Sequence, residues 1–146
     1  MHFFSNYYLT DKFDTKEINK LDKKTIIIYR NYKENSINLA LLKKFKNFCQ
    51  KRNLKLFISN NFKLALYLRL DGVYIPSFNK SLSHLNYSLY KNFMTIGSAH
   101  NVKEIRIKEK QKVDQIVLSS LFKKNKNYLG LNSFKILKNL TKKNVI

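Results

Sequence analysis

The stretch Thr25-Ile26-Ile27-Ile28-Tyr29 decides the fold. It consists of β-branched and aromatic residues, with no alternation between apolar and polar positions. A strand with one solvated face alternates, whereas a strand that helices cover on both faces does not, so this run predicts a buried strand of a parallel sheet. A crossover helix should follow, and after a good N-cap, Ser36, apolar residues recur at helical spacing: they are Ile37, Ala40, Leu41, Phe45 and Phe48.

Short apolar runs and helical patterns alternate along the rest of the chain as well. Strands are expected at 7–9, 25–29, 54–59, 72–75, 93–97 and 114–119, with the start of a seventh at 145–146. Helices are expected at 15–21, 36–53, 62–70, 81–90, 101–112 and 133–140. This alternation predicts an α/β fold with a parallel sheet and right-handed crossovers, and the pattern leaves open whether the sheet is doubly wound or a (β/α) barrel.

Length and composition predict one folded domain spanning residues 1–146. Apolar residues make up 44% and aromatic residues 14% of the chain, which excludes a disordered basic tail. The only cysteine, Cys49, excludes a disulfide framework and predicts a reducing compartment. Because Cys49 flanks the apolar stripe of the helix at 36–53, we expect it to be a small buried hydrophobe rather than a reactive thiol.

The chain is strongly basic, with 29 Lys and Arg against 9 Asp and Glu and a formal charge of +20. Only four of the basic residues are arginine, the side chain that nucleic-acid recognition favours. We therefore expect lysines spread over solvated helix faces and no nucleic-acid partner, although a lysine-rich polyanion-binding protein is the alternative from another functional class. Apolar runs far shorter than the ~20 residues of a membrane span, and no visible secretion signal, predict a cytoplasmic protein without a membrane partner.

Residues that can bind an anion gather at the expected carboxyl ends of the strands, where parallel α/β folds place their sites. The Gly-rich phosphate-binding fingerprints are absent, so a phosphate would be held by side chains. Arg30 directly follows a buried strand and must face either a ligand or a structural carboxylate. His100 follows another strand and precedes the expected helix cap Asn101, a place that suits either proton transfer or a loop hydrogen bond.

Six strand-end segments carry a family resemblance. In chain order they are Tyr8-Leu9-Thr10-Asp11; Ile28-Tyr29-Arg30; Ser59-Asn60-Asn61 with Leu64-Ala65-Leu66; Asp71-Gly72-Val73-Tyr74-Ile75; Ile96-Gly97-Ser98-Ala99-His100 with Glu104; and Leu121-Phe122 with Leu129-Gly130-Leu131. They are similar to the motifs Y-L-x-T-D, Q-x-R-x-K, I-N-D with L-A, D-G-V-H-L, I-G-x-S-x-H…E-A, and P-I-F-P-T with L-G-L-E. From about Tyr7 to the last residue, the chain thus resembles the thiamine-phosphate synthase/TenI family of (β/α) barrels.

The resemblance implies a parallel (β/α) barrel, here incomplete, with about six βα units and the start of strand seven. It implies that the chain joins an aminopyrimidine pyrophosphate to a thiazole phosphate to give thiamine phosphate, using Mg²⁺. The alternative within the family is a TenI-type thiazole tautomerase, which needs no metal, or an inactive relative. By motif position, the phosphorylated precursors would be bound by Arg30, Asn60, Ser98, Lys124 and Lys126, and His100 would be the catalytic proton-transfer residue.

Two departures from the family pattern change these expectations. The aspartates that hold Mg²⁺ in the family are replaced by Asn61 and Asn79, and neutral amides compensate poorly for the dehydration of Mg²⁺, so weak or lost metal binding is expected. In addition, a closed barrel needs eight strands. Six strands leave unpaired edges, so we expect either a truncated product or a barrel completed by another chain, as in a homo-oligomer.

Overall fold

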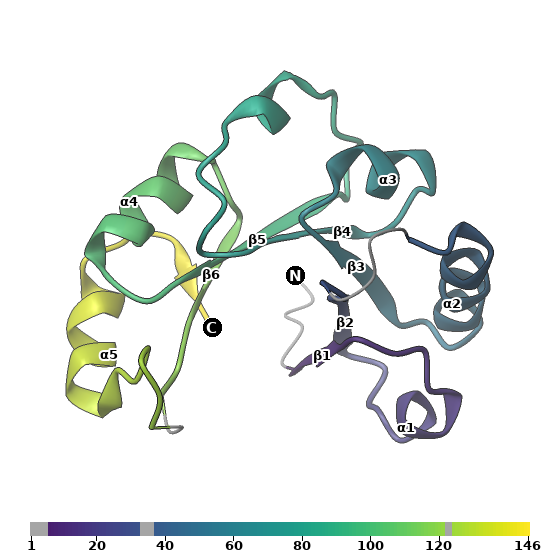
Figure 1. The fold of residues 1–146 in the computed structure, drawn as a ribbon, viewed down its shortest axis with the longest axis horizontal. Coiled ribbons are helices and arrows are strands. Elements are labelled where there is room, and N and C mark those ends of the chain that lie inside the picture. The colour runs from purple at the N-terminus through teal and green to yellow at the C-terminus, as the bar shows by residue number, and fades with distance from the viewer. Residues whose placement is uncertain (1–5, 33–36, 122–123) are drawn as a thin grey trace. The chain divides into compact units, whose positions relative to one another are not determined.

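The computed structural model describes residues 6–32, 37–121 and 124–146 (Figure 1). The chain divides into two compact units, residues 1–73 and 74–146. Their boundary falls inside a strand, β4 (Gly72–Ile75), all of whose residues are buried. The single domain expected from length and composition stays a prediction.

The first unit holds three parallel strands, β1 (Asn6–Thr10), β2 (Thr25–Tyr29) and β3 (Lys55–Ser59), paired in chain order. Its helices are α1 (Thr15–Asn19), α2 (Leu39–Lys51) and α3 (Phe62–Tyr67). All five residues of β2 are buried, which confirms that this apolar run is a strand covered on both faces. The register places Ile27 between Tyr8 and Leu56, so the central strand supplies the core of the sheet.

Helix α2 buries a different stripe from the one predicted. Its N-cap is Asn38, whose Oδ1 accepts a hydrogen bond from the Leu41 N–H at 3.0 Å, and Ser36, the predicted cap, lies outside the described residues. The stripe prediction was wrong for Ile37, Ala40 and Leu41, which are exposed; the buried residues of the helix are Leu42, Phe45 and Cys49. Both stripes have helical spacing, and the contact with β3 decides which of them faces the core.

Two residues of the buried face of α2, Cys49 and Phe45, pack in the core of the first unit. Burial raises the pKa of the Cys49 thiol to about 12, which confirms the expected role as a small buried hydrophobe. The Phe45 ring stacks on Phe13 with centroids 4.7 Å apart and meets Tyr29 edge-on at 5.7 Å. Through these ring contacts α2 packs against β2 and against the segment that precedes α1.

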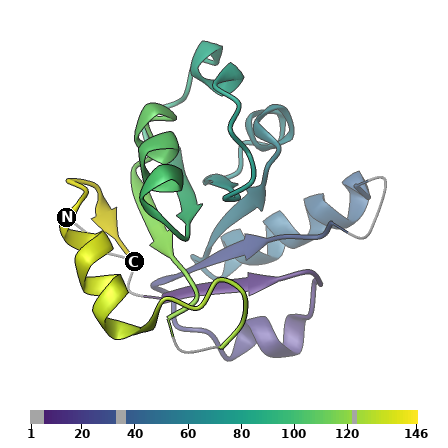
Figure 2. The same ribbon diagram turned by 60° about the vertical axis from the view of Figure 1, so that its left-hand side comes forward.

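The second unit holds the parallel strands β5 (Met94–Ala99), β6 (Gln115–Leu118) and β7 (Asn144–Val145), also paired in chain order. Its helices are α4 (Val102–Lys110) and α5 (Gly130–Asn139), and Figures 1 and 2 show α4 running beside β5. At the start of β6, Asp114 accepts hydrogen bonds from the Thr95 N–H at 2.7 Å and the Thr95 hydroxyl at 3.0 Å. In the first unit Asp71 does the same for the Leu56 N–H at 2.9 Å, so both aspartates set strand register.

The helix expected at 81–90 does not form, and only a 3₁₀ turn, η1 (Ser83–Asn86), occupies this stretch. Its leucines, Leu82, Leu85 and Leu89, are exposed and bury no apolar face that would stabilise a helix. The polar side chains bond the local backbone instead: Asn79 Oδ1 accepts from the Ser81 N–H at 2.8 Å, and Ser81 Oγ from the Ser83 N–H at 3.2 Å. Such bonds compete with helix formation.

Because this connection is irregular, its carbonyl groups need donors from elsewhere. A fully buried lysine, Lys108 of α4, donates to the carbonyl oxygens of Pro76 at 2.8 Å and Asn79 at 2.9 Å. Gln111, at the C-cap of α4, donates to the carbonyl oxygens of Asn79 at 3.0 Å and Ser81 at 2.8 Å. Two buried polar side chains thus replace the hydrogen bonds that a helix would have made internally.

Within 6–32, 37–121 and 124–146, no helix is both long and apolar enough to span a bilayer. The cytoplasmic location stays a prediction.

We expect Phe45→Ala to lower the free energy of unfolding by about 3–5 kcal/mol, because it leaves a cavity beneath two aromatic partners. Urea denaturation of the purified protein measures this loss. Phe48→Ala is the matched control, since Phe48 is half-buried and its ring meets Phe13 edge-on at 5.6 Å, and it should cost clearly less. Equal losses for the two variants would contradict the assignment of Phe45 as the main core residue of α2.

We also expect Lys108 to make the free energy of unfolding depend on pH in the alkaline range. Burial lowers its pKa from 10.5 to about 8, and the negative charge of Glu104, which raises the pKa, offsets this only in part. Below pH 8 the folded and unfolded states both bind this proton; between about pH 8 and 10.5 the unfolded state binds more, so the free energy of unfolding should rise with pH. The rise is ~1.4 kcal/mol per unit of pKa difference.

The measurement is the difference in unfolding free energy between wild type and Lys108→Met, followed by urea denaturation across this pH window. As pH rises, wild type should become more stable relative to Lys108→Met. Lys110→Met, which removes an exposed lysine of the same helix, should show no such trend relative to wild type. A difference that stays constant with pH would show that the Lys108 pKa is not lowered.

Candidate functional site

In the first unit, Arg30 stands at the carboxyl end of β2, as predicted. Its N–H donates to the Thr10 carbonyl oxygen at 2.8 Å, which continues the pairing of β1 with β2 by one residue. Its guanidinium carbon lies 5.9 Å from the centroid of the Tyr32 ring, within reach of a cation–π interaction. The Tyr32 hydroxyl lies 2.6 Å from Ser59 Oγ at the end of β3, so Tyr32 joins the ends of two strands beside Arg30.

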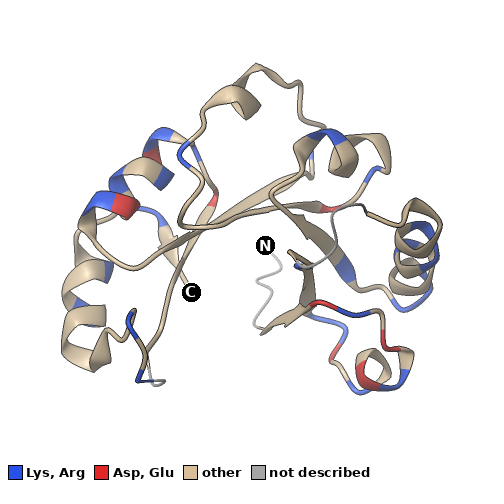
Figure 3. Cartoon of the chain, viewed as in Figure 1, with Lys and Arg blue, Asp and Glu red and all other residues tan. Residues whose placement is uncertain are grey.

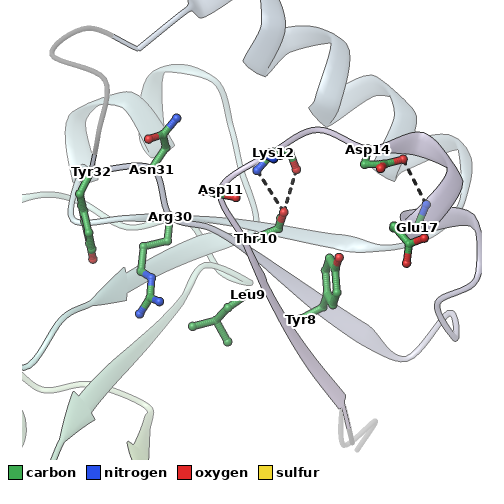
Figure 4. A pocket seen from close by; sticks show the side chains of 10 residues that line it. All are labelled: Tyr8, Leu9, Thr10, Asp11, Lys12, Asp14, Glu17, Arg30, Asn31 and Tyr32. Carbon is green, nitrogen blue, oxygen red and sulfur yellow. Dashed lines mark hydrogen bonds between the residues drawn. The ribbon is translucent and has the colours of Figure 1, made fainter. Parts of the chain in front are cut away.

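Arg30 lines a cavity of about 540 Å³ at the ends of β1 and β2 (Figure 4). Lys12 and the carboxylates of Asp11, Asp14 and Glu17 also line it. In Figure 4 the Arg30 and Asn31 side chains leave the backbone on opposite sides. Among the described residues Arg30 forms no ion pair, and its contact with a ligand stays a prediction.

Asn60 and Asn61 follow β3 but differ in their roles. Asn60 is exposed, and its φ of 61° lies in the left-handed region, which asparagine tolerates better than most residues. Asn61 is the N-cap of α3: its Oδ1 accepts a hydrogen bond from the Leu64 N–H at 3.0 Å. Asn61 therefore starts a helix, and its side-chain oxygen is already engaged.

In the second unit, His100 is the single residue between β5 and Asn101, the N-cap of α4. Glu104, in the first turn of α4, holds it twice: Glu104 Oε2 accepts from the His100 N–H at 2.7 Å and lies 2.9 Å from Nδ1 of the ring. The Asn101 side chain in turn accepts from the Glu104 N–H at 2.9 Å. The result is a half-buried imidazole whose orientation is set by a carboxylate, the arrangement found in acid–base catalysis.

The other predicted residues of this unit lie in three different settings. Ser98 is buried within β5, two residues before His100 and opposite Val117 of β6. Lys124 and Lys126 are exposed in the connection from β6 to α5, which closes on itself through bonds from the Ser120 N–H to Asn127 O at 3.0 Å and from the Leu129 N–H to Ser120 O at 2.8 Å. Asn79 lies in the irregular connection after β4.

The residues at the implied Mg²⁺ positions do not fit a metal ion. The side-chain oxygens of Asn61 and Asn79 are neutral and each already accepts a backbone hydrogen bond, and the Asn79 carbonyl oxygen carries the Lys108 ammonium at 2.9 Å. A positive charge bound to the same residue opposes a divalent cation at Asn79. In the described part of the chain, no group of three or more His, Cys, Asp or Glu side chains could supply other ligands.

The structure thus places the predicted residues in two sets, Arg30, Asn60 and Asn61 in the first unit and Asn79, Ser98, His100, Lys124 and Lys126 in the second. From the sequence, Glu104 is recognised as part of the motif that contains His100 but not as its hydrogen-bond partner, and Lys108 and Gln111 are missed. A signal for Lys108 was available, because it follows Ile105 by three residues and so falls on the buried stripe of α4.

Comparison with known proteins agrees with this architecture. A thiamine phosphate pyrophosphorylase from Pyrococcus furiosus superposes with a TM-score of 0.66 at 14% sequence identity, over 97% of this chain and 73% of its own. At such low identity the likeness shows the fold alone, and it confirms the incomplete parallel (β/α)-barrel type. No curated protein sequence matches significantly.

A sequence comparison identifies the family of this chain. A family model described as thiamine monophosphate synthase matches residues 15–146, which is nearly the whole chain. This match confirms the resemblance that the strand-end motifs indicate. The chain belongs to the thiamine monophosphate synthase/TenI family.

Proposed function

We propose that this protein acts on a phosphorylated thiazole precursor of thiamine as a TenI-type tautomerase, with His100 as the proton-transfer residue. The observation that carries the proposal is the pair formed by His100 and Glu104, with Nδ1 and Oε2 2.9 Å apart at the carboxyl end of β5. Family membership supplies the class of substrate, and the pair supplies the type of reaction.

The geometry of the pair suits a tautomerisation. With Nδ1–H donating to Glu104, the other ring nitrogen, Nε2, can accept a proton from one carbon of the substrate and return a proton to another. One double bond shifts, and the composition of the substrate does not change. Such a step needs a well-oriented acid–base group, and neither a second substrate nor a leaving group takes part.

The synthase reaction makes a different demand, because pyrophosphate leaves and its charge must be stabilised. In the family that stabilisation involves Mg²⁺, and the asparagines at those positions here have their side-chain oxygens engaged in backbone hydrogen bonds. This favours the tautomerase over the synthase. The phosphate-binding roles that the resemblance implies for Arg30, Asn60, Ser98, Lys124 and Lys126 are proposed for each residue separately.

The experiment compares two assays on the purified protein: isomerisation of the thiazole phosphate, and formation of thiamine phosphate from both precursors with Mg²⁺. We expect isomerisation only. His100→Gln should lower kcat by about 10²–10⁴-fold, the usual contribution of a general acid–base group, and Glu104→Gln should lower kcat less because the ring stays in place. Lys103→Ala, an exposed residue in the same turn as Glu104, is the control and should keep full activity.

Two outcomes would contradict the proposal. Formation of thiamine phosphate that survives His100→Gln would show a synthase in which His100 takes no part. Binding of thiamine phosphate without turnover in either assay would show an inactive relative.

Ligand binding tests the role of Arg30 separately from turnover. Thiamine phosphate should raise the melting temperature, because only the native state binds it. We expect Arg30→Gln to weaken binding by about 10–100-fold, as a lost charge-assisted hydrogen bond is worth ~1.5–3 kcal/mol. Arg69→Gln, another exposed arginine of the first unit, is the matched control. An unchanged thermal shift in Arg30→Gln would remove Arg30 from the site.

The polyanion-binding alternative has no comparable support. Lysines lie on all five α-helices rather than at one place, for example Lys16, Lys44, Lys63, Lys103 and Lys135 (Figure 3). The absence of a nucleic-acid partner stays a prediction. Binding to a random single-stranded DNA at increasing salt tests it, since a steep loss of tight binding would favour the alternative.

A further inference from the structure

Lys108 is the most unusual buried group outside the proposed catalytic pair. It is fully buried, with a relative exposure of 0%, although lysine is among the residues least often buried. Its ammonium contacts three oxygens: the carbonyls of Pro76 and Asn79 at 2.8 and 2.9 Å, and Oε1 of Gln111 at 2.9 Å. All three hydrogens of the ammonium therefore have an acceptor.

The side-chain stem has a slot of its own. A Cβ atom at Gly97 would lie 2.7 Å from Cδ and 3.1 Å from Cγ of Lys108, so glycine in β5 makes room for the lysine. Gln111 extends the same support, because its Nε2 donates to the carbonyls of Asn79 and Ser81. The carboxylate whose charge acts on the ammonium is Glu104, one turn earlier in α4.

These contacts have the character of a cation site. The resemblance implies a metal-binding aspartate where this chain has Asn79, and here the Lys108 ammonium bonds the carbonyl oxygen of that residue. The same segment, residues 76–81, has no helix that would satisfy its carbonyls. A cation that binds several of these oxygens at once therefore determines the path of the segment.

We propose that the Lys108 ammonium is a built-in cation that fixes residues 76–81 and makes this segment independent of a divalent metal ion. The proposal goes beyond the tautomerase function and does not depend on it, since it concerns backbone order and not turnover.

The first test uses hydrogen exchange of the Asn79 and Ser81 amides, both of which are hydrogen-bonded in the structure. In the wild type, excess Mg²⁺ or EDTA should leave both exchange rates unchanged. Lys108→Met, which keeps the length of the stem without its charge, should raise both rates at least tenfold and lower the melting temperature by roughly 10 °C, because the Pro76 and Asn79 carbonyl oxygens each lose their charged donor and keep a neutral one. Lys110→Met is the control and should match wild type.

A second test separates the charge from the packing of the side chain. Lys108→Ala leaves space beside Gly97, and propylammonium should restore its melting temperature more than propanol does, with no such difference for Lys110→Ala. Equal rescue by propanol would show that the stem and not the charge matters. If Lys108→Met and Lys108→Ala fail to fold, hydrogen exchange of the wild type alone tests the proposal. Slower exchange of the Asn79 or Ser81 amide on addition of Mg²⁺ would overturn it.

Discussion

The carbonyl groups of Pro76, Asn79 and Ser81 accept hydrogen bonds from side chains of α4 and its C-cap, and this need for donors ties the connection after β4 to the helix. Each buried carbonyl left without a donor costs about 1–3 kcal/mol, and no helix in this connection satisfies them internally. Lys108 and Gln111 supply the donors from α4. Glycine at position 97 fits this arrangement, because a side chain there would occupy the space of the Lys108 stem. The buried face of α4 therefore carries a lysine, whose ammonium reaches these carbonyl groups.

The same helix orients the proposed catalytic residue, His100, which precedes its N-cap. Asn101 begins α4, Glu104 in its first turn orients His100, and Lys108 lies one turn further on. The Glu104 carboxylate thus contacts the imidazole and also supports the buried positive charge. A rigid element that is fixed on its buried side by Lys108 is well suited to hold an acid–base group in one orientation.

At the two positions where the resemblance implies metal-binding aspartates, this chain has asparagines with structural roles. Asn61 caps α3 and Asn79 closes a turn, and both roles need a side-chain oxygen that accepts from a backbone N–H. A neutral amide performs these roles without the charge that a divalent ion requires. The chain belongs to the thiamine monophosphate synthase/TenI family, and under the proposed function these substitutions favour proton transfer over a metal-assisted displacement of pyrophosphate.

The sequence by itself determined the elements whose signals are local. The run at 25–29 predicts a strand buried on both faces, Asn101 predicts the start of α4, and the order of strand-end motifs indicates the family. It also placed Arg30 and His100 at strand ends. Tertiary contacts decided the rest: which stripe of α2 faces the core, whether 81–90 forms a helix, and that Lys108 is buried. These depend on which partner each residue meets, and a one-dimensional period contains no information about that partner.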